Sequence, residues 1–180
     1  MCKTQKMIKV PPTLKCTRAV ISRARIKKDN LVPGMATDAV LGNWCVSMSR
    51  FMGRNVLVYM SERSFLSFIM LEGERITPEK LSISLVRGMV MVVQMSGLGS
   101  EATERVLSDY SVGAFSPTDN PSIQGSLTAI MQDYLYLIDK EGGFSRCNIS
   151  AITHIINHQP NKSLDGNTPF EVTQSLFKAI

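Results

Sequence analysis

Residues 41–71 read LGNWCVSMSRFMGRNVLVYMSERSFLSFIML and contain the only tryptophan of the chain. Apolar and polar residues alternate over 44–51, which indicates a strand with one buried face. The connection at 52–55 contains Gly and Asn, the residue types that accept the positive φ of hairpin turns. Apolar runs over 56–60 and 65–71 follow. The segment therefore predicts an antiparallel meander of three strands.

Helical patterns dominate the rest of the chain. Thr77 and Thr168 each precede a proline, the sequence of a hydroxyl N-cap followed by proline at the first helical position. Thr168 also precedes Glu171 at capping-box spacing. Four helices are predicted over residues 77–95, 120–141, 149–158 and 168–180, with shorter ones at 18–28 and 100–104. We therefore expect an α+β fold, an N-terminal antiparallel sheet (meander) covered by three to four helices.

Size and composition predict one folded unit. The 180 residues are 44% apolar and 19% charged, enough apolar surface for a sizeable core. We expect a flexible basic arm over 1–12, ended by a Pro-Pro pair, and a single α+β domain over 13–180. No apolar run is long enough for a membrane span, and no secretion signal is evident. The four cysteines are widely spaced, which favours free thiols and a cytoplasmic location.

The net charge of +5 is concentrated at the N-terminus. Residues 1–28 carry no acidic residue, and the remaining 152 residues carry 11 basic and 15 acidic side chains. The nine basic residues of this segment are Lys3, Lys6, Lys9, Lys15, Arg18, Arg23, Arg25, Lys27 and Lys28. Such a segment suggests binding to nucleic acid or to an acidic protein, with a merely solvated segment as the alternative. It contains no aromatic residue to stack on bases, which disfavours single-strand binding by this segment.

Catalytic and metal-binding patterns are weak. His154 and His158 are four residues apart on a predicted helix, with Asp165 as the nearest candidate third ligand. The Glu of a His-Glu-x-x-His motif is absent, so we expect no metal and no cofactor. No histidine lies near Cys45 in the sequence to lower the pKa of its thiol. We therefore interpret Cys45 as a buried apolar residue.

Five motifs in order give the chain a family resemblance. They are an opening strand at 14–17, Leu-Gly-Asn-Trp at 41–44, a strand pair at 54–69, a polar turn before a helix at 118–126, and Asn-x-x-Pro at 157–160. The chain resembles, over residues 14–170, a small bacterial family known only as a domain of unknown function. The resemblance implies no catalytic residues. It raises the expectation of an exposed polar cluster formed by Asn43, Asn120 and Asn157.

A second resemblance concerns residues 156–171. Their sequence, INHQPNKSLDGNTPFE, is similar to the tail of integrase-like transposases. Those enzymes hold two metal ions with three carboxylates. The available candidates Asp109, Asp119 and Asp133 lack a strand context that would bring them together. A helix end at Pro160 followed by a new capped helix explains the same residues.

These observations lead to three functional hypotheses. The first is a non-enzymatic interaction protein of bacterial or mobile-element origin, of the antitoxin, inhibitor or accessory-factor type. It would bind a protein partner through the basic arm and a strand edge. The second is a nucleic-acid-binding protein that uses the basic N-terminal segment. The third is a metal-dependent nuclease or hydrolase, or a decayed transposase fragment. The sequence leaves the oligomeric state open.

Overall fold

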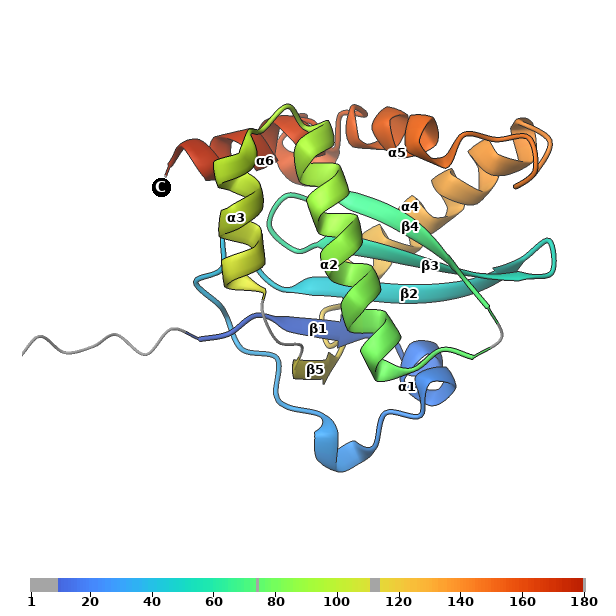
Figure 1. The fold of residues 1–180 in the computed structure, drawn as a ribbon, viewed down its shortest axis with the longest axis horizontal. Coiled ribbons are helices and arrows are strands. Elements are labelled where there is room, and N and C mark those ends of the chain that lie inside the picture. The colour runs from blue at the N-terminus through green and yellow to red at the C-terminus, as the bar shows by residue number, and fades with distance from the viewer. Residues whose placement is uncertain (1–9, 74, 111–113, 180) are drawn as a thin grey trace, which may run out of the picture.

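A five-stranded mixed sheet forms the centre of the computed structural model, which describes residues 10–73, 75–110 and 114–179 (Figure 1). The strands are β1 (Thr13–Cys16), β2 (Trp44–Phe51), β3 (Arg54–Ser61), β4 (Ser67–Glu72) and β5 (Ala114–Pro117). Their spatial order is β4-β3-β2-β1-β5. Strands β2, β3 and β4 pair antiparallel, whereas β1 pairs parallel with both β2 and β5.

The α+β class is confirmed, and the predicted meander corresponds to β2–β4. The expectation of a purely antiparallel, N-terminal sheet is corrected by β1 and β5. Both strands have only four residues, and β5 comes from the middle of the chain, after two helices. Parallel neighbours require a long crossover connection, so their pairing leaves no local signal such as a hairpin turn.

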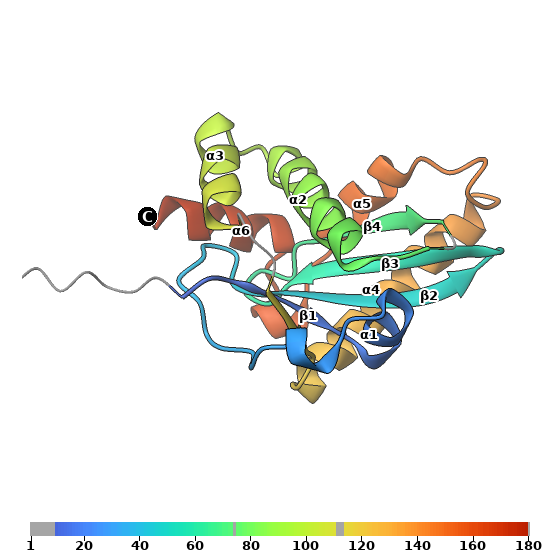
Figure 2. The ribbon, with the colours of Figure 1, turned by 60° about the horizontal axis from the view of Figure 1, so that its bottom comes forward.

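Helices cover both faces of the sheet. They are α1 (Arg18–Ala24), α2 (Pro78–Met95), α3 (Ser100–Asp109), α4 (Pro121–Lys140), α5 (Ile149–Asn157) and α6 (Pro169–Lys178), with short 3₁₀ turns at Lys28–Asn30 and Lys162–Leu164. One apolar cluster joins the sheet to α1, α2 and α3, and a second joins the opposite face to α4 and α5. Figure 2 shows α2 and α4 on opposite sides of the strands. No helix in the described part of the chain combines the length and apolarity needed to cross a membrane.

Strand β3 is buried on both faces. Val58 and Met60 belong to the cluster with α4 and α5, and Leu57 and Tyr59 belong to the cluster with α2. A strand covered on both faces has no solvent side, so its sequence is a continuous apolar run instead of an alternating one. This explains why the run over 56–60 lacks the alternation seen in β2.

Both outer strands are engaged at their exposed backbone. In β4, the Asn157 side chain accepts a hydrogen bond from Ser67 N and donates one to Ser67 O, both at 2.8 Å. In β5, Val32 N donates to Phe115 O at 2.8 Å. Capping an edge in this way hinders its pairing with another chain. The predicted use of a strand edge for partner binding is therefore hindered at these two positions.

Helix α2 lies close to the sheet at Gly88. A Cβ atom added there would overlap the Phe68 ring of β4. The Phe68 ring also stacks on Tyr59, with ring centroids 4.9 Å apart, and contacts Trp44 at 5.6 Å. Glycine at this position therefore permits the close approach of the helix to an aromatic cluster in the core.

We predict that Gly88→Ala destabilises the protein by about 1–3 kcal/mol, because overpacking outweighs the gain of about 1 kcal/mol in helix propensity. Gly125→Ala, in α4, is the matched control, because nothing lies within 4 Å of its added Cβ. That variant should gain stability by up to about 1 kcal/mol. Urea unfolding measures both values. Equal effects of the two substitutions would refute the close approach of α2.

Candidate functional site

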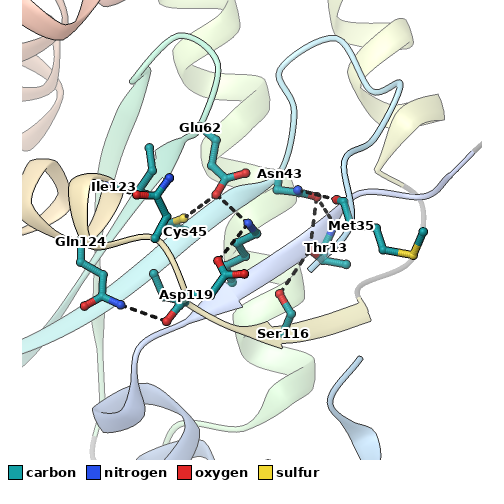
Figure 3. A network of polar contacts seen from close by, with 12 residues as sticks. Thr13, Met35, Asn43, Cys45, Glu62, Ser116, Asp119, Ile123 and Gln124 are labelled. Atoms are coloured by element: carbon teal, nitrogen blue, oxygen red, sulfur yellow. Dashed lines mark hydrogen bonds and ion pairs between the residues drawn. The ribbon is translucent and has the colours of Figure 1, made fainter. Parts of the chain in front are cut away.

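A buried lysine joins four segments of the fold. Lys15 of β1 lies opposite Cys45 of β2 and Ser116 of β5 in the strand register. Its Nζ lies 2.9 Å from Glu62 Oε1, after β3, and 3.4 Å from Asp119 Oδ1, before α4. Only 7% of the Lys15 surface is exposed. Figure 3 labels Cys45, Glu62, Ser116 and Asp119 in this network of polar contacts.

The Lys15 ammonium group is held in its charged form. Burial by itself would lower the pKa of Lys15, but the hydrogen bond and the charge of Glu62, followed by those of Asp119, raise the pKa above its ordinary value of 10.5. Gly34 covers the side chain so closely that an added Cβ would lie 2.9 Å from Lys15 Cε. A permanently charged and covered amine is an ion-pair partner and a poor nucleophile.

The neighbouring thiols are held in their protonated form. Cys45 Sγ lies 3.7 Å from Glu62 Oε1. Burial, with the negative charge of Glu62 as the next cause, raises the pKa of Cys45. Burial also raises the pKa of Cys16 to about 12. Because the thiolate is the nucleophilic species, neither cysteine is set up for nucleophilic catalysis, in agreement with the interpretation of Cys45 as an apolar residue.

The three asparagines predicted to form a cluster hold three different junctions. Asn43 Oδ1 accepts from Thr13 N at 2.9 Å, and Asn43 Nδ2 donates to Met35 O at 2.9 Å (Figure 3). Asn120 caps α4, and Asn157 joins α5 to Ser67 of β4. Asn43 and Asn157 are buried, contrary to the expectation of exposure. The side-chain amides of Asn43 and Asn157 form hydrogen bonds with backbone groups of neighbouring segments. None of these hydrogen bonds connects the three asparagines to one another.

The histidine pair lies on the surface without a third ligand. The His154 and His158 rings are 4.2 Å apart, centroid to centroid, and both contact Phe170. Throughout residues 10–73, 75–110 and 114–179, no three His, Cys, Asp or Glu side chains gather as a metal site requires. Asp165 therefore does not complete a site with the two histidines. The hypothesis of a metal-dependent hydrolase has no assembled centre in this part of the chain.

The three aspartates considered for a transposase-like centre also have separate environments. The Asp109 carboxylate is buried and accepts hydrogen bonds from Arg105 Nε at 3.2 Å and from Val40 N at 3.1 Å. Asp119 pairs with Lys15. Burial raises the pKa of Asp133. The three carboxylates therefore lie in different parts of the fold and do not form one group that could hold metal ions.

The basic N-terminal segment is divided by β1. Lys3, Lys6 and Lys9 lie outside the described residues, and Lys15 is buried and paired, which corrects its assignment as a binding residue. The other five lie on or just after α1 and are exposed: Arg18, Arg23, Arg25, Lys27 and Lys28. In Figure 1, the described chain enters β1 at one side of the molecule, and α1 lies toward the other side. Among its described residues, the basic segment thus consists of the buried Lys15 and an exposed group on or just after α1.

Arginines from separate segments of the chain line two depressions beside α1. Two adjoining depressions share Arg23 in their linings. The first has a volume of 230 Å³ and is also lined by Arg50 of β2 and Arg54 of β3, and the second is also lined by Arg25 and Arg75. All five side chains are exposed. We call this group, Arg23, Arg25, Arg50, Arg54 and Arg75, the arginine surface.

Sequence reasoning found Arg23 and Arg25 and missed the other three members. Arg50 and Arg54 flank the turn of the β2–β3 hairpin, where Arg50 pairs with Asn55 and Arg54 with Phe51. A hairpin places residues on either side of its turn close together, so this pair was detectable from the predicted turn. Arg75 joins them only through the tertiary fold.

Comparisons with known proteins assign a family and no activity. The family model of a domain of unknown function, DUF6933, matches residues 13–172. No curated protein matches the chain. Among solved structures, the catalytic core domain of BIV integrase is similar with a TM-score of 0.47 and 12% sequence identity, over 76% of this chain and 95% of that chain. A TM-score at this level supports no conclusion about activity.

We predict that Lys15→Met destabilises the protein by about 3 kcal/mol, because it leaves Glu62 without its buried partner. Since the folded pKa is raised, the stabilisation is complete below the ordinary pKa of 10.5 and is lost as the pH rises through the folded value. The difference from wild type should therefore be constant between about pH 6 and 9.

Urea unfolding measures this difference, with the exposed Lys162→Met as control. A double-mutant cycle with Glu62→Gln should give a coupling of at least about 1 kcal/mol between the two sites. A coupling near zero would show that the pair does not stabilise the fold.

Cysteine alkylation tests the assignment of the thiols. At about pH 8 we expect iodoacetamide to modify Cys16 and Cys45 at least about a hundredfold more slowly than the half-buried Cys147, because access and thiolate formation are both suppressed. Peptide mass spectrometry measures the three rates. Modification of Cys45 at the rate of Cys147 would indicate an accessible thiolate and reopen a catalytic role.

Proposed function

The chain belongs to the DUF6933 family, and because that family is defined as a domain of unknown function, we propose a function from the geometry. The protein binds nucleic acid without catalysing a reaction, and it contacts the phosphate backbone through the arginine surface. The convergence of five exposed arginines from α1, the β2–β3 hairpin and the segment before α2 is the observation that carries this proposal.

The charge of the arginine surface favours a polyanion. Among the described residues, two acidic side chains, Glu72 and Glu79, line the same depressions as the five arginines, so positive charge is in excess among these described lining residues. Glu72 already accepts a hydrogen bond from Ser84 Oγ at 2.8 Å. Arginine remains charged at every physiological pH, and its planar fork matches phosphate oxygens. The surface therefore has the charge and the donor geometry that phosphate contacts require.

A nucleic acid is favoured over a protein partner for two reasons. The strand edges that would support pairing with another chain are engaged at Ser67 and Phe115. The exposed arginines lie in depressions, and a continuous phosphate backbone supplies a charge at every step along them. A role as an antitoxin, an inhibitor or an accessory factor stays a prediction. Binding to nucleic acid is compatible with each of these roles.

The residues beyond the arginine surface have a secondary place in the proposal. Arg18, Lys27 and Lys28 are exposed on or near α1 and extend the positive potential. Lys3, Lys6 and Lys9 lie outside the described residues, and their contribution stays a prediction. Salt dependence separates these contributions, since each phosphate contact adds about −0.9 to the slope of log K against log salt for duplex DNA.

We predict that Arg50→Ala/Arg54→Ala weakens nucleic-acid binding at all sequences and reduces the salt slope by about 1–2, because two phosphate contacts are lost. Fluorescence anisotropy with a labelled oligonucleotide over a salt series measures both quantities.

The matched control is Lys162→Ala/Lys178→Ala, which removes two exposed positive charges that line neither depression of the arginine surface. It should change the slope little. Binding that is independent of salt, or that weakens equally in both double variants, would contradict the proposal. Binding only to an acidic protein in the same assay would replace nucleic acid as the ligand.

A further inference from the structure

The larger depression of the arginine surface has the dimensions of a ligand site. It lies between α1 and the start of α2, over β2, and has a volume of 960 Å³. We call it the α1–α2 groove. Its described lining is Ala19, Ser22, Arg23, Ala24, Arg25, Met48, Arg75, Ile76, Thr77, Pro78 and Glu79. Sites for small ligands occupy about 300–1,000 Å³, so the groove exceeds what isolated phosphate contacts need.

The lining of the α1–α2 groove is chemically divided. Apolar side chains come from both helical walls and from the sheet, including the half-buried Met48 of β2 and the buried Ile76. Arg23, Arg25 and Arg75 are exposed around them. A nucleotide has the same division, because its base has two apolar faces and its phosphate is anionic. Arginine guanidinium planes also stack on unpaired bases.

The start of α2 does not supply the phosphate site. Thr77 Oγ1 accepts a hydrogen bond from Lys80 N at 3.3 Å. The pKa of Glu79 is lowered, first by a hydrogen bond from its own backbone amide and then by one from Thr77. Side chains at the start of α2 thus already accept hydrogen bonds from the backbone amides of its first turn. The negative charge of the Glu79 carboxylate would also repel an anion at this position. The arginines of the lining are therefore the groups that phosphates would contact, and the groove adjoins the Arg50–Arg54 depression.

From this geometry we propose that the α1–α2 groove receives one unstacked base of a single-stranded nucleic acid, with the flanking phosphates on the arginine surface. The inference rests on the proposed function and specifies its substrate class. A duplex keeps its bases paired and stacked, and extruding one costs a few kcal/mol. Little of this free energy is needed to unstack a base of a single strand, so the groove should bind a single strand more tightly than a duplex. With the half-buried Met48 and the exposed arginines as contacts in place of aromatic rings, selectivity among bases is low.

The test compares three ligands on the full chain at one salt concentration: a single-stranded oligothymidine, a duplex of the same length, and a single strand of the same length with abasic sites. The stacking of an arginine guanidinium on one base contributes about 0.5–2 kcal/mol, so the oligothymidine should bind on the order of tenfold more tightly than either of the others. Fluorescence anisotropy gives the three dissociation constants. This comparison needs no variant.

Ser22→Leu then locates the effect. Ser22 is exposed on α1 and lines the groove, so a leucine there should obstruct the groove without adding an aromatic ring on which a base could stack. We expect the roughly tenfold preference for the oligothymidine to disappear, while duplex binding and its salt slope stay unchanged. Ser150→Leu, exposed on α5, is the control and should keep the preference. Circular dichroism confirms that both variants fold.

The outcomes separate this inference from the proposed function. Equal affinity for the three ligands, with a steep salt slope, would overturn the base-binding groove and leave phosphate binding intact. A preference that survives in Ser22→Leu would place the base elsewhere and also overturn the inference. Absence of salt-dependent binding to all three ligands would overturn the proposed function itself.

Discussion

The fold depends on the neutralisation of one buried charge. Strand β1 lies between β2 and β5 with all four of its residues buried, and one of them is Lys15. A buried ammonium group is tolerated only with partners of opposite charge. Glu62 and Asp119 provide them from the β3–β4 connection and from the segment before α4. The ion pairs thereby join β1, the meander and α4 at one point.

The position of β1 also determines where positive charge accumulates. Because β1 runs through the interior of the sheet, the basic N-terminal segment is divided and α1 emerges beside the β2–β3 hairpin (Figure 1). Arg23 lines one depression with Arg50 and Arg54 of the hairpin and a second with Arg25 and with Arg75, which precedes α2. The arginine surface is thus a product of the tertiary fold, which gathers side chains that lie between positions 23 and 75 of the sequence.

Features encoded locally were predictable, and features that depend on distant partners were not. The caps at Thr77 and Thr168 and the hairpin between β2 and β3 were evident because their signals lie within a few residues. The parallel pairing of β1 with β5 joins residues about a hundred positions apart and leaves no such signal. Lys15 was interpreted as a surface residue because lysine is almost never buried without a partner, and its partners are distant in sequence.

The most direct test of the account is a nuclear magnetic resonance titration of the ¹⁵N-labelled protein with a single-stranded oligonucleotide. The account predicts amide shift changes in α1, at the turn of the β2–β3 hairpin and at the start of α2, which bound the arginine surface. These changes should diminish as salt is added. Changes centred on α3 and α6, or none at an oligonucleotide concentration that saturates typical phosphate binders, would contradict it.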